Sequence, residues 1–175
     1  DEDRAIVAVL SLLARKKKPI QKHLYIKTDC WHILFYDTFR RLFPETPFLF
    51  LYRRPDEIIR SHQNHRGLQS IPTTLEPGLT DIQDDPDTYA DLDGYLIQLL
   101  EKIFSAFDNI NSRDSNTYLI NYNQGPAEMM RALEKATGLR YTDDIRMKME
   151  YRSQFHAKRP TEWFVEEASP VIPSD

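Results

Sequence analysis

The feature that most constrains the fold is the segment FLFLYRRPDEIIRSH, which occupies residues 48–62. Its first five residues are apolar or aromatic without a break, and such a run predicts a strand buried on both faces, typical of a parallel sheet. Pro55 suits the first position of a helix, and Asp56 and Glu57 fall in the first turn, where the helix dipole favours acids. A buried strand that leads directly into a helix predicts an α/β protein.

The rest of the 175 residues alternates in the same way, with further strands predicted at residues 23–27 and 117–122. Apolar residues recur at helical spacing in the segments that we predict to be helices, which are residues 4–17, 32–42, 55–66, 95–108, 126–137 and 143–152. Residues 67–93 are rich in Pro, Thr and Asp, and we expect a long irregular connection of the kind that often forms a lid. We therefore predict one α/β domain over residues 1–175, with a parallel β-sheet flanked by helices.

Composition excludes several classes of protein. The formal net charge of −4 argues against generic nucleic-acid binding, which depends on a basic surface. No run approaches the roughly 20 apolar residues that span a bilayer, so we expect no membrane partner, and a cytoplasmic location is compatible with the sequence. The one cysteine, Cys30, excludes an internal disulfide and a metal site built on several thiolates. The five histidines show no ligand spacing such as H-E-x-x-H, so we predict no metal.

Two arginines, Arg53 and Arg54, follow the buried strand at its carboxyl end. Ligands of open α/β sheets bind at that edge, and the amino end of the following helix offers unpaired N–H groups to an anion. Ser61 lies about two turns into the helix, where its hydroxyl would add a hydrogen-bond donor. A planar guanidinium pairs with two phosphate oxygens at once, so these residues describe a phosphate site. The same pattern also suits a solvated turn with ion pairs on the helix surface.

The spacing of Arg53 and Ser61, eight residues apart across a Pro-Asp-Glu helix start, resembles the 3′-phosphate-binding segment of the sulfotransferases. Three more segments resemble bacterial members of that family: IKTDCWHI, YLINYNQGP and FHAKRPTEWF. Each motif is weak alone, but their order and spacing agree over about residues 24–164. The resemblance implies a P-loop NTPase-like fold and the co-substrate 3′-phosphoadenosine-5′-phosphosulfate (PAPS).

The resemblance also implies roles for individual residues. Arg53 and Ser61 would bind the 3′-phosphate of PAPS, and Tyr122, at the end of the last predicted strand, would lie near the adenine. Arg54 stands where the family usually has Asp or Asn, and it would add a second cation to the site.

Sulfonate transfer needs a base that takes the proton of the acceptor, and in the family a histidine just after a strand has this role. His32 holds the matching place when the residues are counted back from Phe43-Pro44, but it is displaced by one residue when they are counted forward from Lys27. Asp29 is a rival base, and Lys27 would contact the sulfonate or the acceptor. The other possibility is structural, with Asp29 as a helix N-cap and His32 facing solvent.

Two histidines on the helix after the predicted phosphate site, His62 and His65, are in reach of a pocket, but we expect them at the surface. The loop that binds the 5′-phosphosulfate in the family, of the form Pro-Lys/Arg-Ser-Gly-Thr-Thr, has no match in this sequence. In the family that loop lies upstream of the segment that corresponds to the residues around Lys27. We therefore expect the 175 residues to be the C-terminal portion of a sulfotransferase truncated ahead of Asp1.

These observations predict a PAPS-dependent sulfotransferase that acts on a hydroxyl or an amine of a small-molecule, peptide or carbohydrate acceptor. Two alternatives remain open. One is another P-loop transferase, such as a small-molecule kinase, which would depend on Mg²⁺. The other is a non-catalytic module that binds adenosine phosphates.

Overall fold

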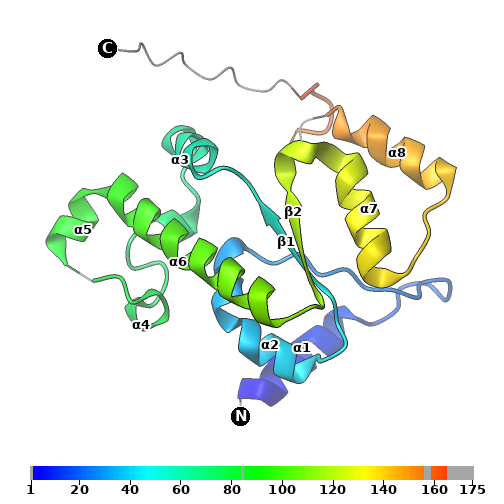
Figure 1. Ribbon diagram of the computed structural model, residues 1–175, viewed down its shortest axis with the longest axis horizontal. Helices are drawn as coiled ribbons and strands as arrows, with labels where there is room; N and C mark the ends of the chain where they lie inside the picture. Colours follow the sequence, from blue (N-terminus) through cyan, green and yellow to red (C-terminus); the bar gives the residue numbers. More distant parts are fainter. Residues whose placement is uncertain (1, 84, 156–158, 165–175) are drawn as a thin grey trace.

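The computed structural model describes residues 2–83, 85–155 and 159–164. Helices dominate these residues, and two short strands lie among them (Figure 1). In chain order the elements are α1 (Glu2–Leu13), the 3₁₀-helix η1 (Cys30–Phe35), α2 (Tyr36–Leu42), β1 (Phe48–Tyr52), α3 (Pro55–Asn64), the 3₁₀-helix η2 (Leu68–Ser70), α4 (Pro77–Thr80), α5 (Pro86–Ala90), α6 (Leu92–Arg113), β2 (Thr117–Asn121), the 3₁₀-helix η3 (Tyr122–Gln124), α7 (Gly125–Thr137) and α8 (Asp143–Ser153).

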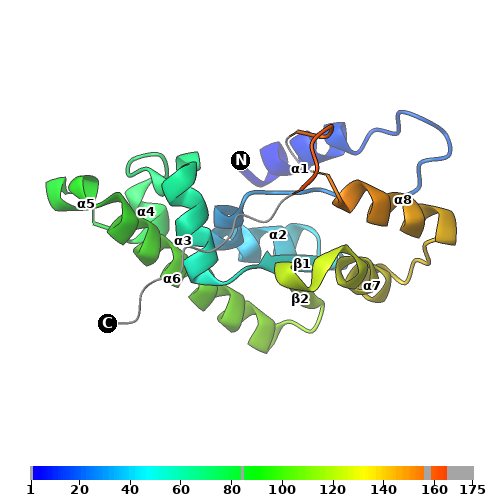
Figure 2. The same cartoon turned by 90° about the horizontal axis from the view of Figure 1, so that it is seen from above.

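The two strands form a parallel pair in which Phe48 is opposite Thr117 and Tyr52 is opposite Asn121. The chain between them carries α3 to α6, as a parallel connection requires. Helix α6 lies on one side of the strands and α7 on the other (Figure 1). Seen from above, α1 and α8 lie on the side of the strands opposite α6 (Figure 2). The predicted α/β class is thus confirmed as a mostly helical protein with a small parallel sheet.

The strand predicted at residues 23–27 is wrong, because residues 21–29 form neither helix nor strand. Three of its apolar side chains, Leu24, Tyr25 and Ile26, are about half exposed. A β-prone sequence becomes a strand only when a neighbouring strand accepts its backbone hydrogen bonds and covers its side chains. Among the described residues β1 pairs with β2 alone, so this segment has no such partner.

Three further boundaries differ from the prediction. Residues 32–42 were predicted as one helix, but their first part belongs to η1 and only the rest to α2. Helix α6 runs beyond residues 95–108 in both directions, and its start is fixed by Asp91, whose carboxylate accepts a hydrogen bond from the Gly94 N–H at 2.8 Å. The connection over residues 67–93 contains the short helices η2, α4 and α5.

One face of α6 supplies much of the core, against β1, η1 and α2. The buried residues of this cluster are Ile33, Tyr36, Leu75, Ile82, Tyr95, Leu99, Ile103 and Ile110. Phe48 and Phe50 of β1 pack against it, with the Phe50 and Phe107 rings 5.2 Å apart. Burial of each such side chain contributes about 1.5–3 kcal/mol, so α6 is the element that holds the strands in place.

A polar cluster ties the amino ends of both strands to α2. Arg40 on α2 donates to the Asp114 carboxylate at 2.6 Å, and the Tyr36 hydroxyl donates to the same group. Arg40 also donates to the carbonyl oxygens of Pro44 at 2.7 Å and Thr46 at 2.8 Å, just ahead of β1. These bonds fix the amino edge of the sheet. Arg53 and Tyr122 directly follow β1 and β2, so they emerge at the opposite, carboxyl edge.

Candidate functional site

The carboxyl ends of β1 and β2 bring Arg53 and Tyr122 together. Arg53 follows β1, Tyr122 follows β2, and the parallel pairing places both at the same edge. The guanidinium carbon of Arg53 lies 5.6 Å from the centroid of the Tyr122 ring. This is the distance of a cation–π contact, which leaves the ring and the guanidinium together at the mouth of a cavity that both residues line.

Glu57, in the first turn of α3, orients Arg53. The Arg53 Nε donates to the Glu57 Oε2 at 2.7 Å, and the Asn123 amide donates to both carboxylate oxygens at 3.0 Å. These hydrogen bonds, first that of Asn123 and then that of Arg53, hold the pKa of Glu57 below its ordinary value. Arg53 bonds to Glu57 through Nε alone. Among the described residues its two terminal nitrogens have no hydrogen-bond partner, so they are available to a ligand.

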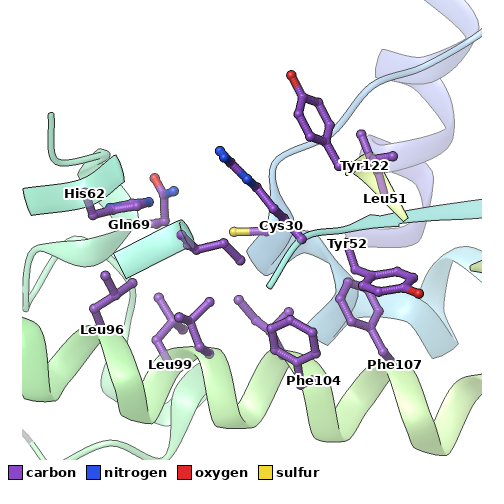
Figure 3. A pocket seen from close by; sticks show the side chains of 14 residues that line it. Cys30, Leu51, Tyr52, His62, Gln69, Leu96, Leu99, Phe104, Phe107 and Tyr122 are labelled. Carbon is purple, nitrogen blue, oxygen red and sulfur yellow. The ribbon is translucent and has the colours of Figure 1, made fainter. Parts of the chain in front are cut away.

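A cavity of about 250 Å³ opens beside Arg53, between α3 and α6 (Figure 3). Its floor is apolar, and the side chains that α6 contributes are Leu96, Leu99, Leu100, Ile103, Phe104 and Phe107. Tyr122 and Leu51 lie at one end in the figure, and His62 and Gln69 lie at the other. The cavity therefore joins a cationic mouth to an apolar interior that ends in two polar side chains.

His62 is a lining residue, so the expectation that it lies at the surface is wrong. Its ring is half-buried, its Nδ1 is 2.9 Å from the Ser70 Oγ, and desolvation together with the Arg66 charge lowers the pKa of His62. Ile58 and His62 are four residues apart on α3 and both face the cavity, a spacing that would have placed them on one side of the helix. His65 is exposed, as expected.

Cys30 is a second lining residue that the sequence did not single out. It begins η1, and its sulfur points into the cavity in Figure 3. Cys30 is exposed overall, but partial desolvation of its thiol raises the pKa of Cys30, the backbone hydrogen bond with Trp31 opposes this shift, and the Asp29 carboxylate adds to it. Because a raised pKa favours the protonated form, Cys30 lines the cavity as a neutral thiol at neutral pH.

Two residues of the predicted phosphate site lie outside the cavity lining. Ser61 is exposed on α3. Arg54 precedes that helix, and its side chain is 70% exposed and pairs with Asp56 at 3.0 Å. Both are open to solvent, and the roles assigned to them stay predictions.

The three residues predicted to act on the acceptor also lie outside the lining. Lys27 and Asp29 are exposed in the irregular segment ahead of η1, and the Asp29 carboxylate makes no capping bond to that helix. The His32 ring lies beside that of Trp31, with 3.9 Å between the ring centroids and 30° between the planes, and its Nδ1 is 3.2 Å from the Asp29 carbonyl oxygen. Their catalytic roles stay predictions. Residues 156–158 of the FHAKRPTEWF segment lie outside the described residues.

Comparison with known proteins identifies no relative: no family model, no curated protein and no solved structure matches this chain. In the described part of the chain no helix is long and apolar enough to cross a membrane. The same residues contain no group of three or more His, Cys, Asp or Glu side chains that could hold a metal ion.

Proposed function

We propose that this chain holds the 3′-phosphate end of PAPS and belongs to a sulfotransferase that passes a sulfonate to a hydroxyl or amine acceptor. The observation that carries the proposal is the pairing of Arg53 with Tyr122 at the carboxyl edge of two parallel strands. The resemblance of the sequence assigns the phosphate to the first of these residues and the adenine to the second. The P-loop NTPase-like fold is part of the same proposal.

The residues present suit a nucleotide that ends in a phosphate. A guanidinium with its two terminal nitrogens available pairs with two phosphate oxygens, and an exposed tyrosine ring offers a face on which a purine stacks. The dipole of the ten-residue helix α3, which begins two residues after Arg53, adds to the attraction for an anion. The 5′-phosphosulfate end has no counterpart among the motifs of this sequence.

The test is a calorimetric titration with 3′-phosphoadenosine-5′-phosphate beside adenosine 5′-monophosphate. We expect the bisphosphate to bind more tightly, because the additional phosphate contacts Arg53. In Arg53→Ala its affinity should fall about ten- to a hundredfold, the effect of losing a charge-assisted hydrogen-bond pair.

Arg131→Ala is the matched control, because Arg131, like Arg53, pairs with a glutamate nearby in the sequence, here Glu128, but lies exposed on α7. It should leave the affinity unchanged. Equal affinity for the two nucleotides would argue against the sulfotransferase proposal and favour the kinase-like alternative. A preference for the 3′-phosphate that survives Arg53→Ala would place the phosphate elsewhere in the chain.

A further inference from the structure

The interior of the cavity differs in character from its mouth. Six apolar side chains of α6 form the floor, and the polar groups at the far end are His62 and Gln69. The volume of about 250 Å³ exceeds the roughly 150 Å³ of an engineered apolar cavity that binds benzene. An apolar site with a few polar groups at one end selects a small apolar molecule with one hydrogen-bonding group.

The hydrogen bonds around His62 determine which of its ring nitrogens carries the proton. The Ser70 Oγ donates its one proton to the Gly67 carbonyl oxygen at 2.7 Å. The 2.9 Å contact between His62 Nδ1 and that Oγ is then a hydrogen bond only if Nδ1 is the donor. The Gly67 N–H also approaches Nδ1, but at 3.3 Å it is the longest of the three contacts, and it favours the opposite tautomer. The two shorter contacts favour a proton on Nδ1, and the NMR experiment below decides between the two tautomers.

The other ring nitrogen, Nε2, has no hydrogen-bond partner among the described residues. The bonds that His62 makes within the described residues all use Nδ1. No buried side-chain nitrogen or oxygen among those residues lacks a partner, so Nε2 is accessible from outside, and the ring that carries it lines the cavity. Because the pKa of His62 is lowered, the ring is neutral at neutral pH and Nε2 presents a lone pair.

We propose that the cavity binds a small apolar alcohol, aliphatic or aromatic, whose hydroxyl donates a hydrogen bond to His62 Nε2, with Gln69 beside it. Its identification as the sulfonate acceptor rests on the proposed function. In that reaction His62, rather than the predicted His32 or Asp29, is the base: the alcohol oxygen forms its bond to sulfur and its proton passes to Nε2. The bond from sulfur to the 5′-phosphate oxygen breaks, and its electron pair leaves with the 3′-phosphoadenosine-5′-phosphate.

Ser70 is the positioning residue in this arrangement. It is fully buried, and it links Nδ1 to the Gly67 carbonyl. Nitrogen-15 NMR of the labelled chain, with His62→Gln for assignment, reads the tautomer directly. We expect the Nδ1–H form at pH 7.5, and a larger share of the Nε2–H form in Ser70→Ala. An Nε2–H ring in the unmodified chain would overturn the proposal, because that nitrogen would then have no lone pair to accept a proton.

Binding is tested with benzyl alcohol and toluene, which differ by one hydroxyl group. In the unmodified chain the alcohol should bind more tightly than toluene. In His62→Phe its affinity should fall about three- to tenfold, as expected for one lost hydrogen bond, and toluene should be unaffected. His65→Phe, at the exposed end of α3, is the matched control and should change neither. Equal binding of the two probes to the unmodified chain would overturn the proposal, and the NMR result stands even if His62→Phe does not fold.

The two proposals fail in different ways. His62→Phe should leave the affinity for 3′-phosphoadenosine-5′-phosphate unchanged, whereas Arg53→Ala should reduce it. Binding of the alcohol through His62 without a preference for the 3′-phosphate would support the alcohol site and contradict the proposed sulfonate transfer. A preference for the 3′-phosphate, together with an alcohol affinity that is unchanged in His62→Phe, would support the donor site and contradict the alcohol site.

Discussion

Glu57 is the residue that tunes the proposed phosphate site, because it holds the same guanidinium that would bind the ligand. Its carboxylate accepts from Arg53 and from Asn123, which joins α3 to the segment after β2. The pair fixes the direction of the Arg53 side chain, which is 34% exposed. The negative charge of Glu57 also repels a phosphate bound to Arg53, so orientation and charge act in opposite directions.

Glu57→Gln separates these two effects. The amide keeps an oxygen that accepts from the Arg53 Nε but removes the charge, so we expect affinity for 3′-phosphoadenosine-5′-phosphate to rise about three- to fivefold, as for removing one charge about 4–6 Å away near a solvated surface. Calorimetry at two salt concentrations measures it, and the gain should shrink at the higher one. A loss of affinity would mean that the carboxylate acts mainly by orienting Arg53.

At the scale of the elements, the sheet depends on contacts made far from the candidate site. Helix α6 covers one face of the strands, and the cluster of Arg40, Tyr36 and Asp114 holds their amino ends. Asp114 caps the connection from α6 to β2, and it also accepts from the Asn116 N–H at 2.8 Å. This carboxylate therefore links α2, α6 and β2, and it is only 18% exposed.

Asp114→Asn should destabilise the protein by about 1.5–3 kcal/mol, because the amide has no negative charge to pair with Arg40 and one accepting oxygen where the carboxylate uses two for its three donors. Urea unfolding at pH 7 measures the change. Asp37→Asn is the control: Asp37 also pairs with an arginine, Arg113 at 2.6 Å, but is 76% exposed, and its loss should fall within about 1 kcal/mol. Equal losses in the two variants would contradict the structural role of the cluster.

The sequence predicted those elements whose limits are set by local chemistry. Strand β1 begins and ends where predicted, because an unbroken apolar run is bounded by Pro47 and Arg53. Helix α7 ends before Gly138, as predicted, and this glycine has the positive φ of 68° that a helix C-cap requires. The strand predicted at residues 23–27 does not form, because a strand needs a neighbouring strand and no local sequence pattern reveals one.

The candidate site was predictable only in part, for the same reason. Arg53 and Tyr122 follow strands, and the parallel order of those strands is enough to bring their ends together. The cavity depends instead on how η1, α3 and α6 pack, so Cys30 and His62 could not be placed in one wall from their positions in the sequence. The spacing of Ile58 and His62 was the one local signal of that wall.

Across the whole molecule, partnered carboxylates connect elements that are distant in the sequence. Glu134 joins α7 to α8, accepting from the Tyr141 N–H at 2.8 Å and from Arg146 at 2.5 Å. Asp93 joins α6 to the end of α3, through Gln63 at 2.9 Å and through Arg66. These bonds lower the pKa of Glu134 and the pKa of Asp93, as those of Glu57 lower its own. The fold is therefore held together partly by groups that acid neutralises.

The expected result is a stability that declines with acid in two stages. The pKa of His62 is lowered from its ordinary value of 6.5. As the pH falls below 6.5, His62 therefore binds a proton in the unfolded chain before it does so in the folded chain, and the stability begins to fall. The carboxylates follow. Their folded pKa values lie below the ordinary 3.8 to 4.5, so their contribution is complete above that range and is lost as the pH falls through the folded values.

On the alkaline side the sign reverses. Desolvation and the hydrogen bond with Tyr25 raise the pKa of Tyr141 to about 12, so the unfolded chain loses its proton first, near pH 10, and stability falls as the pH rises further. Urea unfolding from pH 3 to pH 10.5 should therefore show a maximum between about pH 7 and 9. Glu134→Gln should flatten the acid decline, whereas Glu76→Gln, at an exposed position, should leave the profile unchanged. A profile that is flat below pH 5 would mean that these carboxylates pair as well in the unfolded chain as in the folded one.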